Sequence, residues 1–317
     1  QAALDERRRA EHVLSLAAEH YHRVLTRHPA ARAARDWCAA RSWSSETIVR
    51  EQIGYVLGSD AASSADDTAS GDATPLATTL RAAGLLDHPV AKAVLSIPGD
   101  MVVYVHRSAG RVVFLSGRAL VGRRHYALPA DLVGEKQVYV NAPTAGAFGA
   151  TVLVEGPADA IALGQVGVLA VALCGVASST LHTESGARRR WEISHVGLDV
   201  DRAGELAALD IALGIDPLCR IIRWPDGKDA AEWVQKVSPT RAMVEKVLDD
   251  AGGAIVHLAY RVRTLRDEAR KSAMRRLLDN LLNLDEITAT DIKERLADAM
   301  GVGLQQFNRL LAARKKE

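Results

Sequence analysis

Apolar residues in the first part of the chain recur at helical spacing. Residues 3 to 57 are rich in Ala, Leu and Arg, and this composition and spacing predict an array of short helices. The positions that share one face include Val13, Leu16, Ala17 and Tyr21. Residues 58 to 75 differ, because they are small or acidic and offer almost nothing to bury. Such a composition is typical of a flexible linker.

The segment after this linker mixes helical and strand patterns. A helix is expected from Leu76 to Ala83, followed by β-prone runs at Met101 to Val105 and Arg111 to Leu115. The intervening Ser108, Ala109 and Gly110 predict a hairpin. Between His106 and Ala130 there are five arginines and no acidic residue, which suits contact with a phosphate backbone. They are Arg107, Arg111, Arg118, Arg123 and Arg124.

From Thr151 onward strands and helices alternate. The apolar runs TVLV, VLAVAL, HVGLD and LCRIIRW are separated by helical stretches such as PADAIALGQ and RAGELAALDIAL. This alternation predicts a parallel sheet flanked by helices. From about Pro239 the spacing is helical again, with apolar positions on one stripe and arginines opposite. A small helical domain is therefore expected at the end of the chain.

These patterns predict an α+β protein that contains an α/β domain and has five segments. In order, they are an N-terminal helical segment (1–57), a flexible acidic linker (58–75), a basic α+β subdomain (76–148), the α/β domain (149–238) and a C-terminal helical domain (239–317).

Composition narrows the functional classes. The formal net charge is only +1 and the sequence pI about 7.9, so a nucleic-acid role has to rest on local basic patches. The three cysteines stand far apart and have no CxxC spacing for a zinc ion or redox pair. No apolar run is long enough to span a bilayer, and a cytoplasmic location without membrane contact is expected. The start at Gln1 suggests a piece excised from a longer polypeptide.

Acidic residues follow two of the predicted strands. Glu155 comes directly after TVLV, and Asp199 and Asp201 follow the strand in HVGLDVD. Open α/β sheets build their sites at the carboxyl ends of strands, and carboxylates there suit a hard cation such as Mg²⁺. Asp159 lies one turn into the helix after Glu155. A lone DxD, in contrast, usually marks only a turn or a helix cap.

Four motifs in this order resemble the Toprim domain of bacterial DnaG-type primases: VEGPADAIALGQVG, CGVASSTLH, GLDVDRAGELAA and WPDGKDAAEW. Upstream, ARDWCAARSWSSETIVREQIGYV resembles the helical segment that opens the polymerase core of these enzymes. GRVVFLSGRAL and VYVNAP resemble the basic stretch before Toprim. The resemblance covers roughly residues 30 to 235. It does not include the N-terminal zinc-binding module of the family.

The resemblance implies that Glu155, Asp199 and Asp201 are catalytic and bind Mg²⁺ or Mn²⁺, with Asp159 and Asp229 as accessory ligands. Arg118 and Asn141 match family positions that hold nucleic acid or nucleotide. Further expected contacts come from Arg111, Arg123, Arg124, Lys136 and Lys228. The chain departs from the family pattern at Arg107, Val138, Pro157 and Ala231, where the family has Asp, Lys, an aromatic residue and Asp. Lys136 and Glu232 are the nearby substitutes.

The implied activity is synthesis of short RNA primers on a single-stranded DNA template from nucleoside triphosphates, at a two-metal site. A replicative helicase is the further expected partner. Whether Glu155 ligates metal or acts as a general acid or base stays open at this point. Two other functions use the same features: a Toprim metal-dependent nuclease, and a non-catalytic replisome adaptor.

Overall fold

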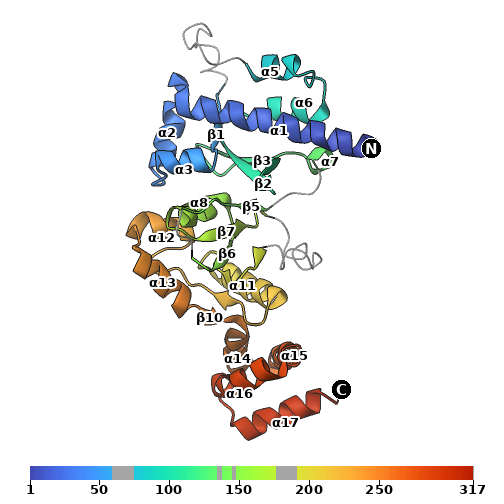
Figure 1. Ribbon diagram of the computed structural model, residues 1–317. Coiled ribbons are helices and arrows are strands. Elements are labelled where there is room, and N and C mark those ends of the chain that lie inside the picture. The colour runs from blue at the N-terminus through green and yellow to red at the C-terminus, as the bar shows by residue number, and fades with distance from the viewer. Residues whose placement is uncertain (59–74, 134–137, 145–147, 176–190, 317) are drawn as a thin grey trace. The chain divides into compact units, whose positions relative to one another are not determined.

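The computed structural model describes residues 1–58, 75–133, 138–144, 148–175 and 191–316 (Figure 1). The chain forms two compact units. Unit 1 contains residues 1–147 and 156–176, and unit 2 contains residues 148–155 and 177–317. The predicted linker lies outside the described residues, except at its two ends. No helix in the described parts of the chain combines the length and the apolar character needed to cross a bilayer.

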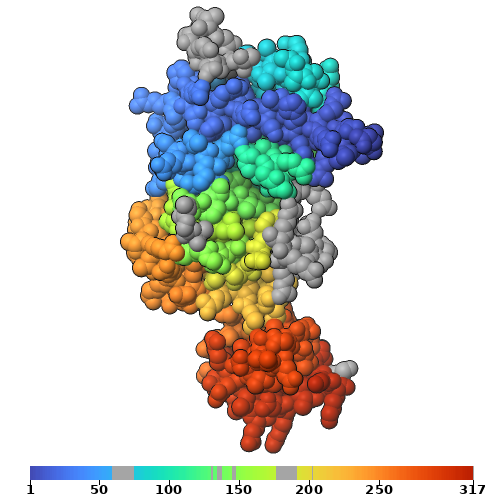
Figure 2. Space-filling model, viewed as in Figure 1, coloured from blue at the N-terminus to red at the C-terminus, as the bar shows by residue number. Residues whose placement is uncertain are grey.

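Unit 1 begins with one long helix, α1 (Ala2–Arg27), where the apolar spacing predicts several short ones. The prediction was wrong here because the segment contains neither Gly nor Pro before Pro29, so nothing interrupts the helix. From Val13 onward the helix packs inward and buries residues such as Val13, Ala17 and Tyr21. The first nine residues are exposed, and the blue atoms of α1 form a band on the surface in Figure 2.

Shorter helices follow α1. A 3₁₀ turn, η1 (Pro29–Ala31), leads into α2 (Arg32–Ala39), and α3 (Ser45–Arg50) follows. Ser44 caps α3, because its Oγ accepts a hydrogen bond of 3.1 Å from the Thr47 N–H.

An antiparallel sheet of four strands forms the centre of unit 1. Its order is β1 (Gly54–Val56), β2 (Met101–Ser108), β3 (Arg111–Ala119) and β4 (His125–Ala127). The predicted hairpin is confirmed, although both strands are longer than predicted. Ala109 and Gly110 make its turn with φ of 50° and 77°, a left-handed conformation that favours glycine.

Helix α1 lies along this sheet (Figure 1). The backbone of β1 comes so close that a Cβ added at Gly54 would stand 2.6 Å from the Tyr21 Cβ. The Tyr21 hydroxyl donates a 2.6 Å hydrogen bond to the Val94 carbonyl in α6 (Pro89–Leu95). Helices α5 (Leu76–Ala82) and α7 (Ala130–Val133) complete this part. The core of unit 1 is therefore the layer between α1 and the sheet.

Unit 1 also holds β5 (Tyr139–Val140), α8 (Pro157–Gln165) and β7 (Leu169–Ala172). Strands β5 and β7 are antiparallel.

Unit 2 contains the expected parallel strands. The order is β10 (Gly252–Gly253), β9 (Arg220–Ile221), β8 (His195–Val196) and β6 (Thr151–Val154). The pairs β6–β8 and β8–β9 are parallel, whereas β10 is antiparallel to β9. Helices α11 (Arg202–Ile215), α12 (Ala230–Val237) and α13 (Arg241–Asp250) connect and follow these strands. The sheet is thus mixed, because antiparallel partners accompany the predicted parallel strands.

The predicted helical tail is confirmed apart from β10. It consists of α14 (Ala254–Thr264), α15 (Asp267–Leu282), α16 (Glu286–Met300) and α17 (Leu304–Arg314). One buried side chain from each helix illustrates the core of the tail: Leu258, Leu277, Leu296 and Phe307.

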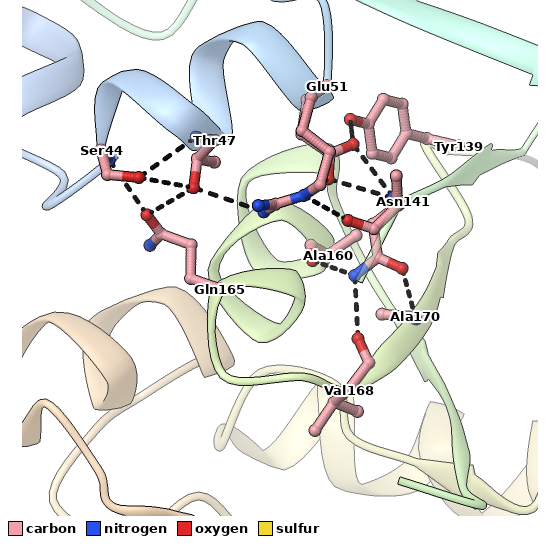
Figure 3. Close-up of polar contacts among 11 residues, drawn as sticks. Ser44, Thr47, Glu51, Tyr139, Asn141, Ala160, Gln165, Val168 and Ala170 are labelled. Carbon is pink, nitrogen blue, oxygen red and sulfur yellow. Dashed lines mark hydrogen bonds and ion pairs between the residues drawn. The ribbon is translucent and has the colours of Figure 1, made fainter. Parts of the chain in front are cut away.

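A buried carboxylate links α3 to β5. The Glu51 side chain follows α3 and is 3% exposed. Its Oε2 accepts a 2.7 Å hydrogen bond from the Tyr139 hydroxyl, and its Oε1 accepts one of 3.0 Å from the Ala142 N–H (Figure 3). Burial raises the pKa of Glu51, while the hydrogen bonds from Tyr139 and Ala142 and the charge of Arg50 oppose the rise. The Glu51 carboxyl, with its raised pKa, therefore binds a proton more tightly in the folded state than in the unfolded state.

This raised pKa predicts a pH dependence. The folded state binds more protons than the unfolded state once the pH rises above the ordinary Glu pKa of 4.5, so the contribution of Glu51 to the unfolding free energy falls with rising pH. Glu51→Gln removes this titration. Measured by urea unfolding, the stability of Glu51→Gln minus that of the parent should increase from pH 4.5 toward neutral pH.

The matched control is Glu46→Gln, at an exposed position of the same helix. Its stability difference from the parent should show no comparable increase. A difference for Glu51→Gln that decreases with pH would mean that the hydrogen bonds and Arg50 outweigh burial.

Candidate metal centre

Three neighbouring strands of unit 2 end in loops that carry acids. Glu155 follows β6 directly, Asp199 lies three residues after β8, and Asp229 lies in the segment after β9. The parallel ladder extends past the strand ends, because the Gly197 N–H donates to the Leu153 carbonyl and the Ile222 N–H to the Val196 carbonyl, both at 2.9 Å. The carboxyl ends of these strands are therefore adjacent, as the sequence predicts.

Asp201 is the N-cap of α11. Its Oδ1 accepts a hydrogen bond of 2.6 Å from the Gly204 N–H. The commonplace role of a DxD sequence, a helix cap, is thus realised at this residue. Only one of its two carboxylate oxygens is used in this way. The carboxylate also lies at the helix end where the backbone dipole stabilises negative charge.

Asp229 has the same role one helix later. It is the N-cap of α12, and its Oδ1 accepts from the Glu232 N–H at 2.7 Å. Its Oδ2 lies 3.6 Å from the Nζ of Lys228. Glu232, in turn, accepts from the Lys228 N–H at 3.0 Å. Glu232, the predicted substitute acid, thus shapes the loop around Lys228 and Asp229.

A backbone hydrogen bond joins the two acidic loops. The Val200 N–H donates to the Lys228 carbonyl at 2.6 Å. Since Val200 stands between Asp199 and Asp201, and Lys228 precedes Asp229, this bond fixes the spacing of the two loops.

Two close packings set the path of the Asp199 loop. A Cβ at Gly204 would stand 2.2 Å from the Asp199 carbonyl oxygen, so only glycine fits there without displacing the loop. A Cβ at Gly197 would stand 2.4 Å from the ring of Trp224, whose Nε1 donates to the Gly197 carbonyl at 3.2 Å. Trp224 is itself buried against Trp233, with ring centroids 5.5 Å apart.

The acids repel one another. Burial raises the pKa of Glu155, and the negative charges of Asp199, Asp201 and Asp229 raise it further. Burial likewise raises the pKa of Asp199, and Asp229 and Asp201 add to the rise while Lys228 opposes it. These four carboxylates therefore form one electrostatic cluster.

The donor set fits a hard divalent cation. Within the described residues, no three carboxylate, imidazole or thiol groups come close enough to form a complete ligand cage. Mg²⁺ does not need one, because it commonly keeps several waters and takes one or two carboxylates together with substrate phosphates. A bound cation would also remove the repulsion that raises the pKa of Glu155 and Asp199.

Asp159 has a local structural role. Its Oδ2 accepts from the Gly156 N–H at 3.2 Å and thereby caps the start of α8. Asp159 lies in unit 1 and the four clustered acids in unit 2. A role as accessory metal ligand stays a prediction.

Asn141 serves as an internal tether (Figure 3). It is buried, and its Nδ2 donates to the carbonyls of Ala160 (2.6 Å) and Val168 (3.0 Å). Its Oδ1 accepts from the Ala170 N–H at 2.8 Å. Both amide protons are therefore used inside unit 1. This arrangement favours a structural role for Asn141 over the predicted contact with nucleotide.

The basic residues of unit 1 differ in their environments. Arg123 and Arg124 are exposed in the turn between β3 and β4, and neither forms an ion pair with a residue that the structure describes. Arg111 is exposed but pairs with Glu11 at 3.4 Å. Arg107 is hydrogen-bonded to Gln52. Lys136, like the CGVASSTLH motif after Gly175, lies outside the described residues.

Arg118 lies near a second arginine that the sequence analysis does not single out. Burial lowers the pKa of Arg41, and the positive charge of Arg118 lowers it further, against the influence of Tyr104. The Arg41 guanidinium stacks 3.3 Å from the centroid of Trp37. The Tyr104 hydroxyl is buried without a hydrogen-bond partner among the described residues. A tertiary arrangement of this kind leaves no trace in sequence spacing.

Comparisons with known proteins agree with this fold. Residues 152–234 match the Toprim-like family model. A DNA primase from Geobacillus stearothermophilus is 29% identical over an alignment of 256 residues, which covers 73% of this chain but only 40% of the relative. A DnaG primase catalytic domain bound to single-stranded DNA superposes with a TM-score of 0.69 at 20% identity, covering 96% of this chain and 99% of that one.

The zinc-binding and RNA polymerase domains of Aquifex aeolicus primase superpose with a TM-score of 0.68 at 15% identity, covering 95% of this chain and 75% of that one. The present chain therefore contains a Toprim-like domain and has the fold of the RNA polymerase core of bacterial DnaG-type primases.

Proposed function

We propose that this chain catalyses nucleotidyl transfer, extending a short RNA primer along a single-stranded DNA template. One observation carries the proposal. Glu155, Asp199, Asp201 and Asp229 form one carboxylate cluster at adjacent strand ends, in a chain whose fold matches a DnaG catalytic domain over nearly its whole length. The substrates would be nucleoside triphosphates and template DNA, which places the reaction in the cytoplasm.

The carboxylates would hold Mg²⁺ or Mn²⁺ ions, and we infer two of them. When bound, such ions neutralise phosphate charge and polarise the attacking and leaving oxygens. Glu155 and Asp199 are the residues whose charge the other acids disfavour, so they gain most from a cation. Asp201 and Asp229 each keep one oxygen on a helix N-terminus, which fixes the direction of the other oxygen. We propose metal binding as the role of Glu155, because it lies in the same cluster as Asp199, Asp201 and Asp229.

Basic residues of unit 1 would hold the nucleic acid. Arg41 and Arg118 bring two positive charges close together, an arrangement that suits a phosphate group. Arg123 and Arg124 are exposed and would follow the template backbone. Lys228, on the other unit, is exposed beside Asp229 and would contact a nucleotide phosphate. A helicase contact through the C-terminal helices stays a prediction.

The chain spans about 40% of the length of the primase that it matches, so the activity of the intact relative is a proposal for this chain. A Toprim nuclease would use the same acids to cut a strand, and an adaptor would bind without reaction. Primer extension, strand cleavage and binding alone are three distinct results of one assay.

Replacing single acids by their amides tests the site. Asp199→Asn and Asp201→Asn should each reduce extension of a dinucleotide primer on single-stranded DNA by at least about a hundredfold. Loss of a ligand charge weakens metal binding, and the bound metal contributes several kcal/mol to transition-state stabilisation. Asn at position 201 can still cap α11, so the fold is retained. Labelled nucleotides with Mg²⁺ or Mn²⁺ provide the measurement.

Asp226→Asn is the matched control, because Asp226 is exposed in the same loop as Asp229. It should keep parental activity. Metal-dependent degradation of the template by the parent, without extension, would replace the primase proposal with a nuclease. Equal activity of all variants would exclude these acids as the site.

Gly204 tests whether the geometry of the loop matters. Gly204→Ala should weaken Mn²⁺ binding roughly tenfold, since the added Cβ displaces the Asp199 backbone and residues that orient ligands commonly contribute this much. Calorimetric titration with Mn²⁺ measures the effect. Gly149→Ala, whose Cβ meets nothing within 4 Å, should bind like the parent. Unchanged Mn²⁺ affinity in Gly204→Ala would show that the path of this loop does not affect metal binding.

The exposed arginines make a salt-dependent contribution. Arg123→Gln combined with Arg124→Gln should weaken binding to single-stranded DNA and reduce the slope of log K against log salt by about 1.4, or 0.7 for each phosphate contact. Fluorescence anisotropy at several salt concentrations measures the slope. The pair Arg8→Gln and Arg9→Gln on the exposed start of α1 is the control. Equal slopes in both double variants would rule out the β3–β4 turn as a template contact.

A further inference from the structure

A cavity of about 160 Å³ lies beside the acid cluster in unit 2. Its walls come from the segment that carries Asp199, the first turns of α11, the end of β9 and one face of α14. The apolar part of the wall includes Leu198, Leu209 and Ile222, all buried. The wall includes Asp199 and Gly204 of the candidate metal centre, while the space itself has no role in the proposed nucleotidyl transfer.

The volume limits what can enter. An apolar cavity of about 150 Å³ holds one benzene molecule. The present cavity has a similar volume and is partly open to solvent, so a single six-membered ring fits inside it with an attached group at the opening. Its apolar wall favours such a ring over a bare ion, because burying apolar surface stabilises the bound state.

Charged groups also line the cavity, two guanidinium groups and the two carboxylates of Glu205 and Asp199. Arg223 and Arg261 supply two guanidinium groups. The single carboxylate paired with them is Glu205, whose Oε1 lies 3.2 Å from the Nη2 of Arg223. Arg261 forms no ion pair with the residues that the structure describes. Arg261 is therefore the guanidinium group that can pair with a ligand.

His257 does not change this balance near neutral pH. Burial lowers its pKa, and Arg223 lowers it further, while Glu205 opposes the shift. The ring is held firmly, because a Cβ at Gly252 would stand 2.5 Å from its Nε2. His257 is thus a rigid, neutral wall of the cavity.

Asp199 borders the cavity as well, but its carboxylate interacts with Asp229, Lys228 and Asp201. A second negative charge beside it would be repelled. The ring of a ligand is therefore expected next to the Asp199 segment, and an anionic group next to the two arginines.

We propose that this cavity is a binding site for a small aromatic anion, a single six-membered ring that carries one carboxylate or phosphate group. Its apolar wall takes the ring and Arg261 pairs with the anionic group. Because residues 198–200 and Gly204 form part of the wall, the occupied cavity contacts the loop that positions Asp199. The site is accordingly a place from which a metabolite can influence the acid cluster.

The test uses the full chain with benzoate as the probe, followed by NMR of the backbone amides and of the His257 ring. Benzoate should cause saturable shifts at Val200 and Gly204 and should raise the pKa of His257, because a nearby negative charge favours the imidazolium. Benzyl alcohol should bind at least about tenfold more weakly, and benzylamine more weakly still.

Variants of Arg261 and Ala208 test the charge and the volume of the cavity separately. Arg261→Gln should weaken benzoate binding roughly tenfold and leave benzyl alcohol unchanged, whereas Arg263→Gln, an exposed arginine on the same helix that does not line the cavity, should leave both unchanged. Ala208→Leu places a larger side chain in the wall and should abolish both.

Non-saturable shifts, equal binding of benzylamine, or equal loss in Arg261→Gln and Arg263→Gln would each overturn the proposal. If Ala208→Leu fails to fold, the arginine pair still decides. Binding is measured on the chain itself, so the outcome does not depend on whether primer synthesis is found.

Discussion

Mutual repulsion among four carboxylates is the constraint on which the candidate site depends. Glu155, Asp199, Asp201 and Asp229 raise the electrostatic cost of one another's negative charge, and the fold has to hold them together all the same. Adjacent parallel strand ends bring them near one another. Two helix N-termini then supply backbone N–H groups that stabilise the charges of Asp201 and Asp229.

Backbone contacts around these acids hold the two acidic loops close together. A single hydrogen bond between Val200 and Lys228 connects the two loops, and Gly204 allows the Asp199 carbonyl to approach α11. Buried Trp224 packs closely against Gly197 and so restricts the path of the loop. We propose that a cluster held in this way receives a cation with little reorganisation, because the carboxylates already lie close together when the charge is compensated.

Unit 1 uses polar groups differently. Glu51 and Asn141 are buried, and their hydrogen bonds tie α3, β5, α8 and β7 into one body. The basic residues that we propose for template binding are therefore those that this packing leaves unpaired. Arg123 and Arg124 belong to that group, whereas Arg107 and Arg111 are occupied by Gln52 and Glu11.

Much of this organisation is determined locally by the sequence. Apolar alternation and periodicity predicted the hairpin, the parallel strands and the helical tail, since burial of one face depends only on spacing along the chain. The acids at strand ends were predictable for the same reason: carboxyl ends of parallel strands must meet. The long α1 was missed because apolar spacing locates a buried face and does not mark where a helix ends. Gly and Pro mark such ends, and their absence before Pro29 indicates that the helix continues.

Only the tertiary structure decided which partner each polar group finds. Asn141 lies in a motif that predicts a nucleotide contact, yet its amide is satisfied by Ala160, Val168 and Ala170, which lie 19 to 29 residues away. Arg41 and Arg118 come together from a helical segment and a strand 77 positions apart in the numbering. The cavity beside Asp199 likewise depends on α14 packing near α11. Long-range packing sets these contacts, and no spacing in the sequence encodes them.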